Sequence, residues 1–458
     1  MLSKKLLLAL FLSQAVWAQA PDPVTSEQAE IQELKRRLAE LEARVSARAA
    51  TTAAPAPVVA QDNLVPTPAP AIPASVAADT TGFRIKSNDG NFSLKIGADL
   101  QTDLRTFTGA GVAGTTDQIL LRRVRPTFSG TVYKDVDYFF RPDFGQGSTI
   151  IYDAYIQFNY FPNAQLRVGK FKPPVGLERL QSDDDTSFIE RGLPTLLVPS
   201  RDIGFQLGGD LLGRRVSYQA GVFNGVPDNS LSDSAPSSHH DYSGRIFLTP
   251  FVRDDNRFLK GLGAGIGASG GSVDGIALPA YKTVGQNTFL SFASGVTSAG
   301  HRTRLAPQTY YYVGPFGLLA EYTLAEEGLQ KTNIRHDIAF RAWQVEASYI
   351  LTGEGKSFLS PTPKHIFDPL HNSWGALELA IRTGDFSAEK ALFNYGFAST
   401  ATSPRTDREW VGGLNWYLNR LVRISFDYGH SAFGGGAPGV LNKLPEQVIL
   451  VRFQLNFI

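Results

Sequence analysis

The chain lacks cysteine altogether and, beyond its first residues, has no apolar run long enough to cross a membrane as a helix. Without cysteine it has neither a disulfide framework nor a thiolate metal site. A membrane-spanning helix needs about 18 to 20 apolar residues in a row, so helical spanning is excluded. The formal net charge is only +1. Nucleic acid is therefore not expected as a partner, and any ion preference must come from the local arrangement of charges.

Motifs of the common enzyme classes are missing as well. None of the seven histidines belongs to an HExxH pair. The glycine-rich run 261–271 is not followed by a predicted helix, so it is interpreted as a strand with glycines facing a lumen rather than as a nucleophile elbow. We therefore expect no enzymatic activity, no cofactor and no metal site.

The first residues have the pattern of a secretory signal peptide. Lys4 and Lys5 precede an apolar core at Leu6–Leu12, and small residues follow it. We place cleavage after Ala18, so residues 1–18 are the predicted signal peptide.

Residues 19–48 are predicted to form a coiled-coil helix. Apolar side chains recur at spacings of three and four from Val24 to Val45, with charged residues between them. So short a helix needs partners to be stable in water, and a parallel, trimeric coiled coil is expected, with a single solvated helix as the alternative. Residues 49–82 are rich in alanine and proline and are predicted to be an extended linker.

From Phe83 onward the apolar residues recur with a period of two, which is typical of strands that have one apolar face. The last segment shows it best, with apolar side chains alternating from Ile449 to Phe457. Each segment has about nine to thirteen residues, the length of a tilted strand that crosses a bilayer.

We count sixteen or seventeen such segments in residues 83–458, with 286–294 the doubtful one, and predict sixteen because single-chain outer-membrane barrels favour even numbers. The predicted fold class is all-β, a 16-stranded antiparallel transmembrane β-barrel with an N-terminal α-helical coiled-coil segment. A soluble β-sandwich also alternates, but here the polar face carries arginine and aspartate. Short connections also alternate with long ones, as in outer-membrane barrels. The long connections are 184–200, 225–240, 351–373, 384–407 and 429–445. Aromatic residues near the segment ends are expected to form interfacial girdles: Tyr133, Tyr160, Phe161, Trp343, Trp410, Trp416 and Tyr417.

The polar face of the barrel is predicted to line a water-filled lumen. Arg122 is out of phase with Arg123, so both can point inward only if a β-bulge intervenes. Arginine suits carboxylate and phosphate oxygens, but inward acids are present too, and a field of arginines opposed by acids is an equal alternative to a dedicated anion site. The predicted inward residues are Arg123, Arg125, Arg141, Asp153, Arg245, Glu321, Glu346, Glu378, Arg382, Arg423 and Arg452.

The segment Leu166–Gly209 contains about thirty residues that fit neither a helix nor a strand. A loop of this length in a β-domain is usually functional. We predict that residues 173–201 fold into the lumen and constrict it. The side chains expected to face the solute there are Lys170, Lys172, Glu178, Arg179, Asp183, Asp184 and Asp185.

Several sequence stretches together resemble the phosphate-selective porin O/P family of trimeric, sixteen-stranded outer-membrane channels. They are LLRRVRPTFSGTVYKDVDY (120–138), GKFKPPVGLE (169–178), YQAGVFNG (218–225), ASYILTGE (347–354), WGALELAIR (374–382), GLNWYLN (413–419) and VRFQLNF (451–457). The resemblance implies that the loop after GKFKPPVGLE is the constriction. It also implies an anion site at the Arg122–Arg123 pair and the acidic residue Asp153.

Two departures from that family pattern bear on selectivity. Where the family has a constriction-loop lysine, this chain has Asp183–Asp185, and where the family has a ladder of arginines, the region 263–286 has only Lys282 as a basic residue. Carboxylates in place of a cation at a narrow point reverse the local field. We predict a homotrimeric outer-membrane porin for passive diffusion of small hydrophilic solutes and ions, phosphate or other anions among them, with outer-membrane lipid and lipopolysaccharide around it. The alternative is a general or weakly cation-favouring porin whose periplasmic coiled coil also tethers the outer membrane to peptidoglycan.

Overall fold

The computed structural model describes residues 32–44, 74–79, 82–108, 116–235, 237–435 and 445–457. The chain divides into two compact units, residues 1–71 and Ile72–Ile458. The predicted signal peptide, 1–18, lies outside the described residues, as does most of the predicted linker.

In the first unit the described residues 32–44 form one helix. Leu34, Leu38 and Leu41, which belong to the predicted coiled-coil seam, are about 60% exposed in the single chain (62%, 59% and 59%). Ion pairs one turn apart, such as Glu33 with Arg37 at 3.1 Å, support the helix locally. Of the helices in the described part of the chain, none has the length and apolar character of a membrane span.

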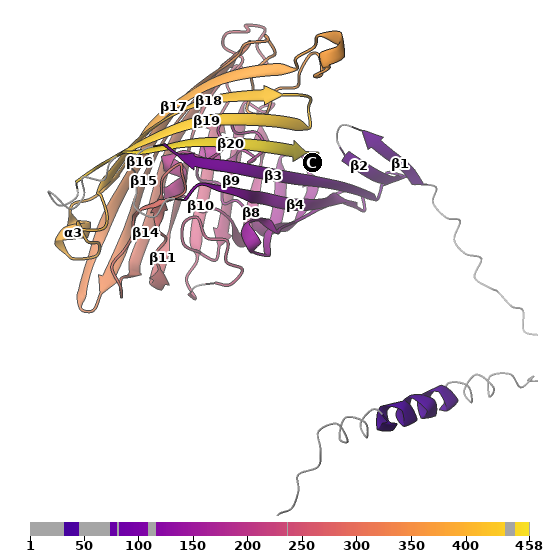
Figure 1. Cartoon of the computed structure of the whole chain (residues 1–458), viewed down its shortest axis with the longest axis horizontal. Coiled ribbons are helices and arrows are strands. Elements are labelled where there is room, and N and C mark those ends of the chain that lie inside the picture. Colours follow the sequence, from indigo (N-terminus) through magenta and orange to yellow (C-terminus); the bar gives the residue numbers. More distant parts are fainter. Residues whose placement is uncertain are drawn as a thin grey trace, which may run out of the picture. The chain divides into compact units, whose positions relative to one another are not determined.

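The second unit contains a closed barrel of sixteen antiparallel strands (Figure 1), as predicted. The first and last strands close it, with Arg452 opposite Asp103. Their side chains form an ion pair of 2.7 Å on the inner face. The strands are β3 (Ser93–Phe107), β4 (Gln118–Val132), β5 (Val136–Asp143), β6 (Ile150–Phe161), β7 (Ala164–Phe171), β8 (Asp202–Leu211), β9 (Val216–Phe223), β10 (Asp241–Leu248), β11 (Leu262–Ala277), β14 (Thr297–Val313), β15 (Phe316–Lys331), β16 (Ile334–Ile350), β17 (Ala376–Ala388), β18 (Thr406–Tyr417), β19 (Val422–Gly434) and β20 (Glu446–Asn456).

A small hairpin precedes the barrel. β1 (Ala74–Asp79) pairs with β2 (Gly82–Ser87), and β2 also pairs with the start of β3. All six residues of β1 are exposed. The segment 49–82, predicted to be a linker without paired structure, therefore ends in a strand.

Alternation along each strand separates two environments, as the sequence pattern predicts. Polar side chains of the inner face are buried by the inward-folded segments, whereas the large apolar side chains of the outer face remain exposed for lipid. Arg245 is half-buried and the other predicted inward residues are buried. Tyr417 departs from the prediction of an interfacial girdle. It is only 3% exposed and its hydroxyl donates to Glu378 on the inner face.

Connections at the two ends of the barrel differ. Because consecutive antiparallel strands alternate in direction, the short turns at 133–135, 162–163, 314–315 and 418–421 all lie at one end, here called the turn end; the opposite end is the loop end. In Figure 1 α3 (Ala391–Asn394) marks the loop end, and β1 and β2 lie at the turn end. The long connection 351–375 was expected to lie with the other long loops, but it lies at the turn end. The backbone N–H of Lys356 donates to Gly314, and that of Phe367 donates to Leu418.

Four segments fold into the barrel. The connection 172–201 contains α2 (Leu177–Leu180) and the 3-10 helix η2 (Leu193–Leu197). From the loop end, 224–240 and 278–296 follow it inward, and from the turn end comes part of 351–375. The doubtful segment 286–294 is not a barrel strand, because it contains β13 (Thr288–Leu290), which pairs with β12 (Tyr281–Lys282) inside the barrel. A hydrophobic cluster joins these inner elements to the wall: Leu193, Leu197, Tyr281, Phe289, Leu290, Leu329, Ile338, Phe340, Phe386, Leu392 and Phe397.

Candidate functional site in the barrel lumen

The connection 172–201 is held across the lumen as a constriction loop, from its first turn onward. The backbone N–H groups of Leu177 and Glu178 donate to the carboxylate of Glu321 on β15, at 2.9 and 3.1 Å. Gly267 of β11 lets the loop touch the wall, because a Cβ there would lie 2.1 Å from the carbonyl oxygen of Val175. Gly267, one of the glycines predicted to face the lumen, is thus a point on which the loop rests.

Glu178 closes the loop on itself rather than facing the lumen. Its Oε2 accepts hydrogen bonds of 2.9 Å from the backbone of Gly192 and from the side chain of Gln344. It is 1% exposed and lines none of the three lumen pockets described below.

A β-bulge lets Arg122 and Arg123 share the inner side of β4. Gln101 of β3 is opposite Arg123, and the next residue, Thr102, is opposite Leu121, so Arg122 has no partner in the ladder. Both guanidiniums then reach the constriction loop. Arg122 binds Glu190 at 2.8 Å, and Arg123 lies 3.4 Å from Asp183. The bulge that the sequence required for an inward pair is present.

Asp183 is the focus of a cluster of arginines. Its carboxylate lies 2.6 Å from Arg125, 2.6 Å from Arg191 and 3.4 Å from Arg123, and it accepts a hydrogen bond from the hydroxyl of Tyr152. Burial alone would raise the pKa of Asp183, but the three guanidiniums outweigh it and hold the pKa well below its usual range. The charge of Asp183 is therefore fully engaged by the protein.

Glu190 forms a second such cluster. It accepts hydrogen bonds from Arg122 and from Arg105, the latter at 3.0 Å, and lies 3.7 Å from Arg452. Burial opposes ionisation, but the arginines lower the pKa of Glu190 below its ordinary value. Asp183 and Glu190 together fasten the constriction loop to the wall of β3, β4 and β20.

Asp184 and Asp185 face the turn end instead. Asp185 accepts a hydrogen bond of 2.8 Å from the backbone N–H of Ser360, in the connection 351–375, and Asp184 accepts one of 3.3 Å from Gln101. Both line a pocket of about 400 Å³ together with Arg420 and Arg423. The three consecutive aspartates, expected to act together on the solute, are thus divided between the two faces of the loop.

The remaining predicted site residues are spread along the neighbouring wall and bind protein groups. Lys170 lies 2.5 Å from Asp233 of the segment 224–240. Lys172 donates to the carbonyl oxygen of Gln181 at 2.7 Å. Asp153 lies 3.3 Å from Arg201, and Arg141 donates to Thr127 at 3.0 Å.

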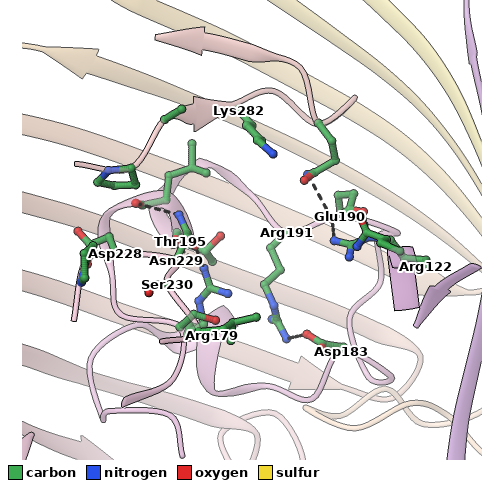
Figure 2. A pocket seen from close by; sticks show the side chains of 18 of the residues that line it. Arg122, Arg179, Asp183, Glu190, Arg191, Thr195, Asp228, Asn229, Ser230 and Lys282 are labelled. Atoms are coloured by element: carbon green, nitrogen blue, oxygen red, sulfur yellow. Dashed lines mark hydrogen bonds and ion pairs between the residues drawn. The ribbon is translucent and has the colours of Figure 1, made fainter. Parts of the chain in front are cut away.

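A lumen pocket of about 600 Å³ lies on the loop-end side of the constriction and is lined by the constriction loop, by residues of 224–240 and 278–296, and by the barrel wall (Figure 2). Arg191 crosses it toward Asp183, and Lys282 of β12 points into it. Lys282 is exposed, and among the described residues it has no ion pair. Arg179 donates to the carbonyl oxygen of Thr195 at 2.6 Å and to Asn229, again with no carboxylate partner in the described part of the chain.

Several of these residues were not predicted as site residues. Glu190 and Arg191 lie in the constriction loop, whose non-alternating sequence gives no phase from which a facing direction can be predicted. Lys282 was noted only as the single basic residue of its region, and the β12–β13 hairpin that carries it inward has no pattern of its own. The only feature of the sequence that could have identified Glu190, Arg191 and Lys282 as site residues was that each is a charged residue within a long segment without strand alternation.

Comparison with known proteins agrees with this architecture. The model of the family of phosphate-selective porins O and P matches residues 94–457. The chain belongs to that family. Porin O of Pseudomonas aeruginosa is 26% identical over 381 residues, which cover 76% of this porin and 84% of that protein.

Solved structures with little sequence identity share the fold. The outer-membrane channel DcaP of Acinetobacter baumannii is 12% identical, with a TM-score of 0.54 over 82% of this porin and all of that chain. An anion-selective porin from Comamonas acidovorans is 11% identical, with a TM-score of 0.50 over 80% of this porin and all of that chain. This porin is therefore an outer-membrane channel for ions, and its family and fold indicate a channel rather than an enzyme.

Proposed function

We propose that this porin passes small anions, phosphate among them, through the pocket formed by Arg179, Arg191 and Lys282. The supporting observation is a difference in pairing. Every acid that lines the pocket is paired with an arginine: Asp143 with Arg125, Asp183 with Arg191, Glu190 with Arg122, Asp228 with Arg304 and Glu409 with Arg382. Two cations of the lining, Arg179 and Lys282, have no carboxylate partner among the described residues.

The pairing leaves a positive field in this pocket. Asp183 is shared by three arginines and Glu190 by at least two, so neither carboxylate repels an anion with its full charge. Ammonium and guanidinium groups bind phosphate oxygens by charge-assisted hydrogen bonds. Lys282 would then act in place of the lysine that relatives carry in the constriction loop. This argues against the cation-favouring alternative, which depended on three free aspartates.

The test is reversal potential in a salt gradient across a planar bilayer, followed by titration with phosphate. Anion preference with phosphate block is expected. Lys282→Gln should weaken phosphate block about fivefold or more, because it removes a charge-assisted contact. The matched control is Lys390→Gln, an exposed lysine at the same end of the barrel that does not line the pocket. Cation preference in the unmodified porin, or equal block in both variants, would contradict the proposal.

The N-terminal segment is assigned a part in assembly. Three exposed leucines, Leu34, Leu38 and Leu41, follow one side of the helix 32–44, which favours burial against copies of itself. We assign this segment to the periplasm, as a parallel coiled coil that supports a homotrimer of barrels in the lipid and lipopolysaccharide of the outer membrane and can approach peptidoglycan. Chemical crosslinking of the full chain should give trimers. Deleting residues 22–71 should lower the yield of crosslinked trimer without changing single-channel conductance; an unchanged yield would rule out the supporting role.

A further inference from the structure

A patch of aromatic rings lies on the inner wall at β5, β6 and β7. Phe139 and Tyr155 are stacked, with ring centroids 5.3 Å apart and an angle of 8° between planes. Tyr155 contacts Phe171 edge-on at 6.0 Å. Phe139 and Tyr155 are half-buried, and they share the inner face with Arg141 and Asp153. These rings therefore face the lumen rather than lipid.

Two arginines, Arg167 and Arg245, line the same cavity as these rings and have no ion pair among the described residues. The guanidinium of Arg167 lies 4.4 Å from the ring centre of Tyr155 and donates to the amide oxygen of Gln157. Arg245 donates to the amide oxygen of Gln308 at 2.9 Å. Neither has an ion pair within the described ranges. The acid nearby, Asp153, is bound to Arg201.

Two glutamine side chains complete the same wall. Gln206 of β8 is 6% exposed, and its Oε1 has no hydrogen-bond partner; the Oε1 of Gln219 on β9 also has none. A buried amide oxygen without a partner is unfavourable in the folded protein unless a hydrogen-bond donor fills the position. Both side chains border one cavity.

That cavity has a volume of about 320 Å³ and lies on the turn-end side of the constriction. Its wall is formed by the aromatic patch, the two arginines, the two glutamines, Lys172 and Asp153, whose carboxylate is engaged by Arg201. Leu180 of the constriction loop and Phe358 of the connection 351–375 close it. It shares no lining residue with the pocket of Arg179 and Lys282. A cavity of this size that combines aromatic walls with convergent polar groups suits a small organic molecule.

We propose that this cavity binds an organic anion with a flat aromatic body, of the aromatic carboxylate class. The ring of the solute stacks on Tyr155 and Phe139, and its carboxylate binds Arg167 and Arg245. The unpartnered amide oxygens of Gln206 and Gln219 are acceptors and take a donor such as water. A small inorganic anion would leave the apolar walls uncovered. The inference goes beyond the proposed anion passage, since it names a second site and a second class of solute.

Three compounds separate the contributions of ring and charge in a planar bilayer that contains the full-length porin. Sodium benzoate has both the ring and the carboxylate, sodium acetate has the carboxylate alone, and benzyl alcohol has the ring without the charge. Benzoate should reduce chloride conductance at concentrations at least about fivefold lower than acetate, because of ring stacking. Benzyl alcohol, which has the ring without the charge, should not block. Equal potency of benzoate and acetate would overturn the proposal.

Two variants assign the block to this cavity. Arg245→Gln should weaken benzoate block about fivefold or more and leave phosphate block unchanged. Tyr155→Leu should bring benzoate to the potency of acetate without altering the reversal potential. Barrel formation is checked by resistance to denaturation on unheated gels. Lys282→Gln supplies the reverse pattern, with phosphate block weakened and benzoate block kept. If benzoate still blocks both Arg245→Gln and Tyr155→Leu with unchanged potency, the proposed cavity site is wrong. If phosphate fails to block while benzoate still does, the result contradicts the proposed function and leaves this site standing.

Discussion

Asp183 and Asp185 lie two residues apart in the constriction loop and have opposite surroundings. Asp183 faces the loop end among Arg123, Arg125 and Arg191, whereas Asp185 faces the turn end and accepts a hydrogen bond from the backbone of Ser360. Carboxylates that are consecutive in sequence therefore do not act as one cluster of negative charge in the folded protein. The loop divides the lumen into two faces, and the field on each is set by which neighbours the fold brings to it.

The two faces also differ in what a lost carboxylate would leave behind. Without its charge, Asp183 would leave three buried guanidiniums facing one another, which is costly in a low-dielectric interior. Without its charge, Asp185 would leave one backbone N–H, which an amide oxygen can still satisfy. We therefore expect variants at the two positions to differ strongly in both stability and selectivity.

The largest effect is expected for Asp183→Asn. The variant should lower the free energy of unfolding by about 3 kcal/mol, because one partner of a buried ion cluster is removed. It should also move the reversal potential toward anions, since Arg123, Arg125 and Arg191 lose their common counter-charge. Urea unfolding in lipid vesicles and bilayer recordings measure the two effects.

The control for that variant is Asp255→Asn, which removes an exposed carboxylate at the turn end. Asp255→Asn should change neither the free energy of unfolding nor the reversal potential measurably, because exposed charges contribute little to stability. Equal free energies of unfolding in Asp183→Asn and the unmodified porin would show that the arginine cluster does not fasten the loop.

The regular part of the molecule was predictable, and the loop contacts were not. Residues such as Arg382 and Arg452 were placed on the inner face correctly because strand alternation has an exact period of two. The sequence also showed that a β-bulge at Arg122 was needed if both Arg122 and Arg123 were to point inward, because adjacent residues of a regular strand lie on opposite faces. Alternation also allowed the inward position of Tyr155, which is in phase with Asp153, although its contribution to a cavity was not recognised.

Partners inside the lumen depend on contacts between residues far apart in sequence. Asp183 meets Arg125 across 58 positions, and Glu178 meets Gln344 across 166. No local pattern encodes these distances. The same reason explains the connection 351–375, whose length suggested the loop end. Successive connections alternate between the two ends of the barrel. Because the very short turn between Lys331 and Ile334 lies at the loop end, the next connection, 351–375, lies at the turn end.

A second prediction concerns pH. The arginines depress the pKa of Asp183 in the folded state, so its stabilising contribution is present above the unfolded pKa, about 3.9, and is lost as pH falls through the folded value. Burial, then the neighbouring Asp184, raises the pKa of Asp185, and its contribution is most favourable at low pH and lost as pH rises through the folded value. Asp185 thus becomes neutral before Asp183 on acidification.

The measurement is the free energy of unfolding of the unmodified porin minus that of Asp183→Asn, followed with pH. This difference should stay constant from about pH 7 to pH 5 and begin to shrink only below about pH 4. A difference that already narrows between pH 7 and pH 5 would mean that the arginines do not hold Asp183 ionised, and the contrast between the two faces would then weaken.

The smallest effect is expected for Asp185→Asn. The amide oxygen of the new side chain can still accept from Ser360, so the free energy of unfolding should change by less than about 1 kcal/mol. The reversal potential should stay within experimental error, because Arg420 and Arg423 line the same pocket as Asp185 and keep its net charge near balance. The triple variant with asparagine at positions 183, 184 and 185 should then match Asp183→Asn alone. A further anion-directed shift in the triple variant would show that the two turn-end carboxylates also act on the permeating ion, and that the loop does not separate two electrostatic environments.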